Sequence, residues 1–311
     1  MDCIDTLLSV CQSFFASHTV TNISVHESLM NYLISGISGL IGSRLSQKLR
    51  SAGHSVFYIS RDFKIVNQTN FETAKENLSK IPEYFDTFFH CASAHPSIST
   101  DDVEIIRGNI TFTKDLLKHL AGIQIESVIF CSSVAIFGQC RKSELDVDSP
   151  IIMPSLYGRV KLETEKYITD WSAQKNTKIH IVRLPAVIGQ NGHGTFLVKL
   201  ITAIKNGEAL TINSKKSRFN HAVYLDDVCA FMKALSCDCK YSTLSILGAT
   251  CPLTLGDIVS LVHQRLCILE SNVEETDVIS NIINTRPAEL LGFKSMKTRE
   301  IIIKQIQLLG I

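Results

Sequence analysis

The chain has 311 residues, of which 45% are hydrophobic and 20% are charged. This is the composition of a globular protein with a sizeable core, and the length fits one large α/β unit or two domains. Thirty-one Lys and Arg oppose thirty Asp and Glu, which leaves a formal net charge of +1. Such a balance provides no field that would gather nucleic acid or an anionic membrane, so we expect a small-molecule partner held by local sites.

The ten cysteines form no C-x-x-C pair and lie mostly in apolar runs. This pattern differs from a disulfide framework or a zinc site, so we interpret them as reduced thiols and expect no metal. No apolar run approaches the ~20 residues that a membrane-spanning helix needs. The N-terminus carries Asp2 and Asp5 where a signal peptide would carry basic residues. We therefore expect a cytoplasmic protein.

Residues 1–29 precede the first predicted strand, and the sequence assigns this N-terminal extension no role. The segment from Ile4 to Phe15 is amphipathic, which is typical of a helix added to the fold. The alternative is an overextended reading frame, because Met30 stands where a chain that opens on the first strand would begin.

The pattern over residues 31–61 predicts a strand, a helix and a second strand. A short apolar run at 32–35 passes through three glycines into an apolar-periodic helix, which leads to a strand at 55–60. Further strands are predicted at 87–90, 127–132, 178–184 and 244–247, with helical patterns between most of them. Near-continuous apolar strands that alternate with helices predict an α/β fold with a Rossmann-like, doubly wound parallel sheet.

Three glycines at the first strand–helix junction form the pattern G-x-x-G-x-x-G. Glycine permits a positive φ and a close approach of the backbone to a pyrophosphate, while the helix N-terminus supplies amide hydrogens to the phosphates. The pattern predicts a dinucleotide-binding turn, and its spacing is typical of a short-chain dehydrogenase. Its predicted cofactor contacts are Gly36, Ser38, Gly39, Leu40, Ile41 and Gly42.

The turn places an NAD(P)-binding domain at residues 30–188, with the later strand near 243–248 rejoining it. A smaller substrate-binding lobe is expected over most of 189–311, where loop-rich stretches are common. The end of the second strand carries Ser60 and Arg61, a hydroxyl and a cation suited to a 2′-phosphate, so we prefer NADP. The neighbouring Asp62 keeps NAD as the alternative.

Tyr157 and Lys161 lie four residues apart on a predicted helix, and such residues share one face. The lysine ammonium can then favour the phenolate and lower the pKa of the tyrosine. Upstream, a predicted strand ends in Ser132 and Ser133, where a hydroxyl could hydrogen-bond a substrate carbonyl. The Tyr157 and Lys161 pair therefore does not stand alone in the sequence.

At this point the chain resembles the extended short-chain dehydrogenase/reductase superfamily, the NAD(P)-dependent epimerase/dehydratase family that acts largely on nucleotide sugars. The resemblance runs from Tyr32 to about Phe293. It rests on the glycine motif, the segment His90-Cys91-Ala92, Ser132-Ser133 before Gly138, Tyr157-x-x-x-Lys161, Arg183-Leu184-Pro185 before Gly189, and Val223-Tyr224-Leu225-Asp226-Asp227-Val228.

The resemblance implies roles for individual residues. Ser133 would polarise the reacting oxygen, Tyr157 would be the general acid/base, and Lys161 would hold the nicotinamide ribose. Ser132 is expected to cap the backbone at a strand end, and His90 to pack near the cofactor. Further cofactor contacts implied by the resemblance are Cys91, Ala92, Ser93, Asn109, Leu184 and Pro185.

Some positions depart from the family pattern. Val134 and Ala135 replace the acidic groups of 4,6-dehydratases and cannot transfer protons, so that activity is disfavoured. Ala186 stands where many epimerases carry an asparagine that contacts the sugar nucleotide. Asn220 occupies the position of an arginine that often grips the diphosphate, and Arg218 lies two residues ahead of it. Ala186, Arg218 and Asn220 are the candidate substrate contacts.

We predict first an NADP-dependent oxidoreductase, a nucleotide-sugar 4-ketoreductase in which Tyr157 gives its proton to the developing alkoxide. The alternative is a nucleotide-sugar 4-epimerase with tightly bound NAD. A third hypothesis is a nucleotide-binding relative without turnover, against which the intact Ser133, Tyr157 and Lys161 argue. The family also implies a homodimer formed through helices at about 101–119 and 157–174.

Overall fold

The computed structural model describes residues 29–67, 81–96, 101–190, 192, 194–238, 240–278 and 280–311. The expectations for residues 1–28 therefore lie outside the described residues. The chain divides into two compact units. The first contains the described parts of residues 1–136, 155–183 and 232–245, and the second contains residues 137–154, 184–231 and 246–311.

The first unit is built on a seven-stranded sheet with the order β12-β7-β5-β4-β1-β2-β3. Its strands are β1 (Asn31–Ser35), β2 (Ser55–Ile59), β3 (Ile65–Asn67), β4 (Tyr84–His90), β5 (Gln124–Ser133), β7 (Lys178–Leu184) and β12 (Thr243–Ile246). β1 pairs in parallel with β2 and β4, and β4 pairs in parallel with β5. The predicted Rossmann-like sheet is confirmed, and the strand predicted near 244–247 joins it at the edge as β12.

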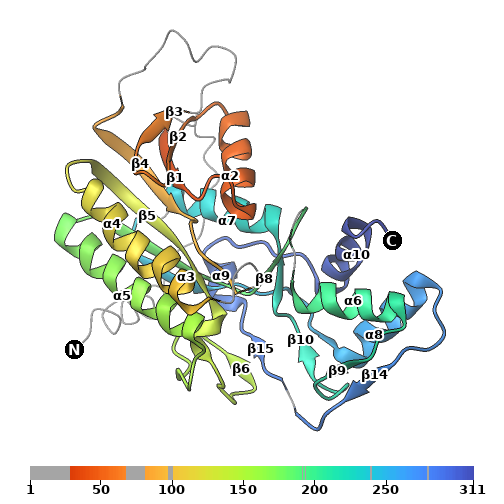
Figure 1. Ribbon diagram of the computed structural model, residues 1–311. Helices are drawn as coiled ribbons and strands as arrows, with labels where there is room; N and C mark the ends of the chain where they lie inside the picture. The colour runs from red at the N-terminus through yellow and green to blue at the C-terminus, as the bar shows by residue number, and fades with distance from the viewer. Residues whose placement is uncertain are drawn as a thin grey trace. The chain divides into compact units, whose positions relative to one another are not determined.

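Helices cover both faces of this sheet. α2 (Leu40–Ser51) and the end of α7 (Leu225–Asp238) lie on one face, and α3 (Asp102–Ile106), α4 (Phe112–His119) and α5 (Leu156–Lys175) lie on the other (Figure 1). The central strands therefore bury side chains on both faces, including Tyr32 and Leu33 on β1 and Phe88 and Phe89 on β4. This double burial explains the near-continuous apolar runs of the sequence.

The helix predicted at about 101–119 is interrupted. A π-helical segment, Arg107–Thr111, separates α3 from α4, and Asn109 lies within it. A Cβ on Gly108 would come within 2.6 Å of the Ala94 side chain, so this segment packs tightly against the loop that follows β4. A π-helical insertion rotates the residues after it and is common at functional sites.

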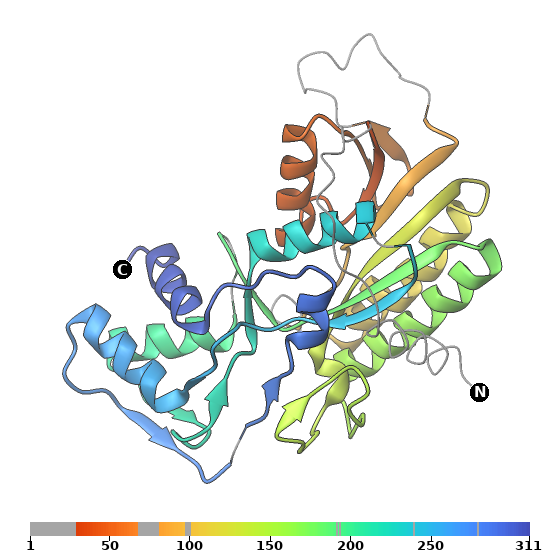
Figure 2. The same cartoon turned by 180° about the vertical axis from the view of Figure 1, so that it is seen from behind.

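The second unit pairs short strands and packs three helices around its own core. β6 (Glu144–Leu145), β8 (Ala186–Ile188) and β9 (Leu210–Ile212) pair in parallel with β15 (Ile282–Ile283), β11 (Ala222–Tyr224) and β14 (Val273–Glu275), and β10 (Arg218–Phe219) pairs antiparallel with β13 (Leu253–Thr254). α6 (Phe196–Asn206), α8 (Leu255–Leu266) and α10 (Thr298–Leu308) lie together (Figure 2), and α9 (Arg286–Leu290) is a short helix. Leu200, Ile258 and Ile302 are buried in the shared core.

This division differs from the domain boundaries expected from the sequence. Residues 137–154 belong to the second unit although they lie inside the predicted cofactor domain, and the unit border falls at 183/184 instead of 188/189. The cause is the pairing of β6 with β15, which ties an early segment to one more than a hundred residues later. Among the described residues, no helix is both long and apolar enough to cross a membrane.

Candidate functional site

The glycine turn joins β1 to α2 by close backbone packing. Gly36 has φ +75°, and a Cβ there would come within 2.6 Å of the Ala92 backbone nitrogen. A Cβ on Gly42 would come within 2.2 Å of the Gly36 carbonyl oxygen, while Gly39 N donates to that same oxygen at 3.0 Å. Only glycine fits these positions, so the turn lies directly against the loop after β4.

The N-terminus of α2 has the features of an anion site. Its N-cap is Gly39, and in the described chain no side chain caps the helix. Ser38 and Gly39 are exposed, which keeps the amide groups of the first turn accessible. Amide hydrogens and the helix dipole together favour a phosphate at such an end. The turn therefore fits the pyrophosphate of a dinucleotide.

The loop after β2 carries the residues predicted to select the cofactor. Ser60 Oγ donates to the carboxylate of Asp62 and accepts from Lys64 N at 3.1 Å, and Lys64 Nζ lies 3.0 Å from Asp62 Oδ2. The bond from Ser60 is the largest cause that lowers the pKa of Asp62. Arg61 is exposed. An ionised carboxylate and a guanidinium thus both lie just beyond the carboxyl end of β2.

The loop after β4 is tied to the π-helical segment through Asn109. Ser93 donates from Oγ to Asn109 Oδ1 at 2.7 Å, and Asn109 Nδ2 donates to Ala94 O at 2.9 Å and to Ile105 O at 2.8 Å. Asn109 is 2% exposed. The predicted contact residues Cys91, Ala92, Ser93 and Asn109 are therefore brought together with Gly36, and their role toward a cofactor stays a prediction.

His90 is a buried, neutral packing residue. Its Nε2 lies 2.8 Å from Thr113 Oγ1 and its Nδ1 lies 2.6 Å from Ser35 Oγ. Since Thr113 already donates to Asn109 O, Nε2 carries the proton and Ser35 donates to Nδ1. Burial lowers the pKa of His90 to about 3, with a smaller contribution from the charge of Lys161. The ring supports the turn and does not titrate near pH 7.

Tyr157 lies in the first turn of α5, where Ser155 accepts a hydrogen bond from Gly158 N and begins the helix. Burial raises the pKa of the Tyr157 phenol, and hydrogen bonding with Ser93 and Ser133 opposes that rise. Ser133 Oγ also accepts from Ala135 N at 3.1 Å, which leaves its O–H for donation toward the phenol. Ser133 and Tyr157, which were predicted from separate motifs, thus lie together at the carboxyl end of β5.

Lys161 is 2% exposed and lies one helical turn after Tyr157. Its Nζ donates to Cys131 O at 2.8 Å and lies 4.7 Å from the Phe130 ring centroid and 6.0 Å from that of Tyr157. Burial lowers the pKa of Lys161 to about 8, and this fall is opposed by Cys131, Glu165 and Cys91. The prediction that Lys161 lowers the pKa of Tyr157 is wrong for the net effect, because burial of the phenol raises that pKa.

Two residues near Tyr157 and Lys161 were missed in the sequence. His95 meets the Tyr157 ring edge-on, with 5.1 Å between ring centroids. Glu165 is buried, pairs with Arg183 and accepts a hydrogen bond from Ser132. The prediction that Ser132 caps the backbone is therefore wrong, because its hydroxyl bonds a carboxylate. The available signal for Glu165 was its spacing, four residues after Lys161 on one helix face.

The remaining predicted contact residues lie in the second unit. Leu184 begins the segment 184–231 of this unit and is also the last residue of β7. Leu184 is buried, and Ala186 begins β8. Arg218 is exposed on β10. Asn220 is 1% exposed, donates from Nδ2 to Ala249 O and Ile283 O, and accepts from Ile283 N. Its amide thus joins three segments of this unit, and substrate contacts of Ala186, Arg218 and Asn220 stay predictions, as does the cofactor contact of Pro185.

Among the described residues, no group of three or more His, Cys, Asp or Glu side chains could hold a metal ion.

Comparison with known proteins identifies a family and several relatives. A family model described as the NAD dependent epimerase/dehydratase family matches residues 32–238. The chain is 22% identical over 213 residues to an N-acetyl-alpha-D-glucosaminyl-diphospho-ditrans,octacis-undecaprenol 4-epimerase of Escherichia coli O157:H7, covering 65% of this chain and 62% of that protein. It is 26% identical over 224 residues to Protein CapI of Staphylococcus aureus, covering 64% and 67%. The chain thus spans about two thirds of the length of these relatives.

Solved structures show the same fold. A UDP-glucuronic acid 4-epimerase from Bacillus cereus in complex with NAD superimposes with a TM-score of 0.71 at 19% identity, covering 91% of this chain and 100% of that one. MoeE5 in complex with UDP-glucose and NAD gives a TM-score of 0.69 at 22% identity, covering 90% and 98%.

Proposed function

Because the chain belongs to the NAD dependent epimerase/dehydratase family, we propose that it is a nucleotide-sugar 4-epimerase that works with bound NAD. The observation that carries the proposal is the assembly of Ser133, Tyr157 and Lys161 at the carboxyl end of β5. In open α/β sheets ligands bind beyond the carboxyl ends of the strands, where the glycine turn also lies.

The three side chains can move a proton to and from a sugar hydroxyl. Tyr157 takes the proton of the hydroxyl at carbon 4 and returns it when the sugar presents its other face. Ser133 donates its O–H to the same sugar oxygen, and the Lys161 ammonium beside the phenol favours the phenolate against the rise in pKa that burial causes. Bound NAD supplies the hydride acceptor and donor for carbon 4.

The comparisons favour the 4-epimerase hypothesis over the ketoreductase that we predicted first. The Escherichia coli relative and the Bacillus cereus structure are both 4-epimerases by name. Val134 and Ala135 supply no proton-transfer group beside Ser133, which keeps the dehydratase reading disfavoured. The ketoreductase remains the second candidate, favoured by the exposed Arg61, since a freely exchanging NADPH would suit reduction.

For the cofactor we propose NAD, with NADP as the alternative preferred from Ser60 and Arg61. The support is Asp62, whose carboxylate is held at the end of β2 by Ser60. A carboxylate there can accept a hydrogen bond from the 2′-hydroxyl of the adenosine ribose and repels a 2′-phosphate. The single O–H of Ser60 already donates to this carboxylate, so a bond from Ser60 to a 2′-phosphate would require that this bond be broken.

The purified protein should contain NAD and interconvert the two carbon-4 epimers of a UDP-linked hexose, hexuronic acid or N-acetylhexosamine. Product is measured by chromatography without added cofactor. Stoichiometric consumption of NADPH with a UDP-4-keto-sugar, and no interconversion of epimers, would replace the 4-epimerase with the ketoreductase.

We also propose the homodimer expected from the resemblance. Val103 and Ile106 on α3 are 66% and 41% exposed, which leaves apolar surface beside the helices expected to pair. Light scattering should give about twice the mass of 34.5 kDa. A monomer at micromolar concentration would contradict the dimer.

A further inference from the structure

The most buried ion pair of the described chain joins α5 to the end of β7. Arg183 donates from Nη2 to Glu165 Oε2 at 2.8 Å and from Nε to Glu165 Oε1 at 3.1 Å. The two side chains are 3% and 1% exposed. A bidentate pair buried to this extent holds its two side chains in one geometry, because little of either charged group is open to water.

The Glu165 carboxylate also binds Ser132, which lies at the carboxyl end of β5 next to Ser133. Ser132 Oγ donates to Glu165 Oε1, so this oxygen accepts from β5 and from Arg183 together. Ser132 is flanked by Cys131, whose carbonyl holds the Lys161 ammonium, and by Ser133. Fixing Ser132 therefore fixes the short backbone segment that carries the Cys131 carbonyl, which binds Lys161, and the Ser133 hydroxyl.

Glu165 also lies one helical turn after Lys161 on α5, on the same face. Its charge thus acts on Lys161 through space as well as through the end of β5. Ser132, Ser133, Lys161, Glu165 and Arg183 all belong to the first unit.

We propose that Glu165 is a positioning residue, whose carboxylate fixes Ser132 at the end of β5 and holds the Lys161 ammonium in its charged form beside Tyr157. The proposal rests on the proposed function for what Lys161 and Tyr157 do. An apolar pair could fill the same space and is often at least as stabilising as a buried ion pair, so packing alone does not require a carboxylate here.

The electrostatic surroundings of Lys161 support this role. The titratable groups that act on it or face it come from three places: Tyr157 and Glu165 on α5, Cys131 on β5, and His90, Cys91 and His95 at the end of β4 and in the loop after it. Burial lowers the pKa of Lys161, and Glu165 is among the groups that raise it again. His90 and His95, with their pKa values lowered, stay neutral near pH 7.

Glu165→Gln tests the charge while keeping a hydrogen-bond acceptor for Ser132. Because this change leaves Arg183 without its carboxylate, the double variant Glu165→Gln/Arg183→Met removes the buried pair together and protects the fold. The pKa of Lys161 is followed by NMR of carbon-13-labelled lysine side chains, with its signal assigned from the loss in Lys161→Met. Glu165→Gln should lower this pKa by about one unit, and the double variant should lower it less, because the guanidinium is removed together with the carboxylate.

Turnover gives a second readout. At pH 8 a fall of one unit takes the charged fraction of Lys161 from about one half to about one tenth, so kcat should fall about fivefold. The KM for the sugar nucleotide should change less than about twofold, because Glu165 does not touch it. NADH binding, measured by fluorescence, should weaken at pH 8 in both variants.

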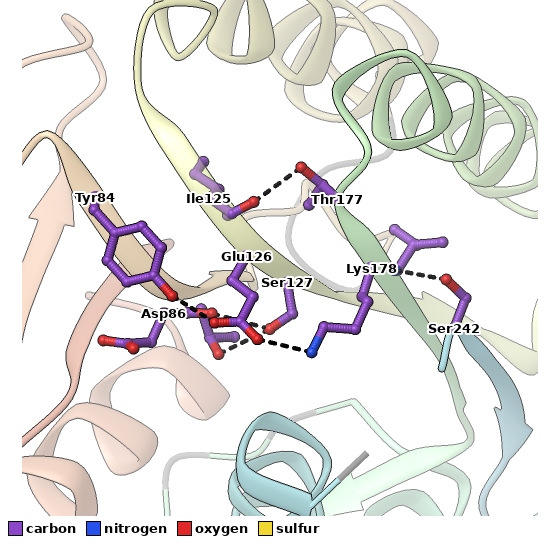
Figure 3. A network of polar contacts seen from close by, with 10 residues as sticks. Tyr84, Asp86, Ile125, Glu126, Ser127, Thr177, Lys178 and Ser242 are labelled. Carbon is purple, nitrogen blue, oxygen red and sulfur yellow. Dashed lines mark hydrogen bonds and ion pairs between the residues drawn. The ribbon is translucent and has the colours of Figure 1, made fainter. Parts of the chain in front are cut away.

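The matched control is Glu126→Gln, at the other end of the same strand. Figure 3 shows Glu126 in a network at the amino-terminal ends of β4, β5 and β7, where Lys178 Nζ lies 2.9 Å from its Oε1 and Tyr84 donates to it. This variant should leave the pKa of Lys161 and kcat unchanged.

A folded Glu165→Gln variant that keeps the kcat and the Lys161 pKa of the parent would overturn the proposal and leave Glu165 as half of a structural ion pair. The two proposals fail separately. Absence of epimerisation by the parent protein overturns the proposed function, while the Lys161 titration still decides whether Glu165 controls the ammonium.

Discussion

Gly42→Ala tests whether the glycine turn is needed for cofactor binding. A Cβ at this position would lie 2.2 Å from Gly36 O and 2.8 Å from Gly36 C, and both atoms belong to backbone. Ordinary contact requires at least 3.4 Å, so α2 and the turn must separate by roughly 1 Å. Overpacking of this kind costs about 2 kcal/mol, which corresponds to a fall in Tm of roughly 4–8 °C.

The effect on cofactor binding should exceed the effect on stability. The amide groups of α2 and the turn approach the phosphates only while β1, the turn and the helix keep their spacing. A displacement of roughly 1 Å breaks these hydrogen bonds, and the loss of about 1.4 kcal/mol weakens NADH binding tenfold. Thermal unfolding and NADH fluorescence titration measure the two effects.

Gly122→Ala is the control. Gly122 is exposed in the connection between α4 and β5, and a Cβ there meets no heavy atom within 4 Å. This variant should keep both the Tm and the NADH affinity of the parent. If Gly42→Ala binds NADH as tightly as Gly122→Ala, the turn is a structural link and the cofactor site lies elsewhere.

Tyr157→Phe should lower turnover about 10²–10⁴-fold and leave NADH binding within about threefold of the parent, and turnover within a few-fold would refute the acid/base role. Asp62→Asn should weaken NADH more than NADPH in fluorescence titrations, whereas a larger loss of NADPH in Arg61→Ala would restore the NADP assignment. The pKa of His90 is about 3 when folded and about 6.5 when unfolded, so the unfolded state takes up a proton first and stability falls as pH decreases below 6.5. In urea unfolding between pH 6.5 and 5, His90→Gln should reduce this slope by up to about 1.4 kcal/mol per pH unit, and an unchanged slope would contradict the burial of a neutral ring.

The sequence predicted the parts of the fold whose causes are local. β1, the glycine turn, α2 and β2 follow one another within about thirty residues, and their apolar periodicity and glycines are direct signals. The boundaries of β7 agree with the predicted strand at 178–184. Ser133, Tyr157 and Lys161 each stand in a short motif, so the sequence could propose them as a site, and the fold brings these motifs together at the carboxyl end of β5.

The missed features depend on contacts between distant segments. The π-helical segment around Asn109 has no periodicity signal of its own, since one extra residue per turn is invisible in an apolar pattern. Glu165 stands in no motif, and Arg183 was noted only as part of a family motif, so their pairing appears only when α5 packs on the sheet and buries both. The pairing of β6 with β15, which moves residues 137–154 into the second unit, links segments that share no motif.

Two ion pairs at opposite ends of β5 should contribute very different amounts to the unfolding free energy of this nearly neutral chain. Glu126 is half exposed, so water screens its pair with Lys178, and Glu126→Gln should cost less than about 1 kcal/mol of unfolding free energy. Glu165→Gln removes the carboxylate that pairs with a buried guanidinium and should cost about 3–5 kcal/mol. Urea unfolding compares the two directly, and equal costs would mean that water reaches the Glu165 pair. Water at the carboxyl end of β5 would then solvate the Lys161 ammonium, and the pKa of Lys161 would not be lowered, since desolvation is the largest cause of that shift.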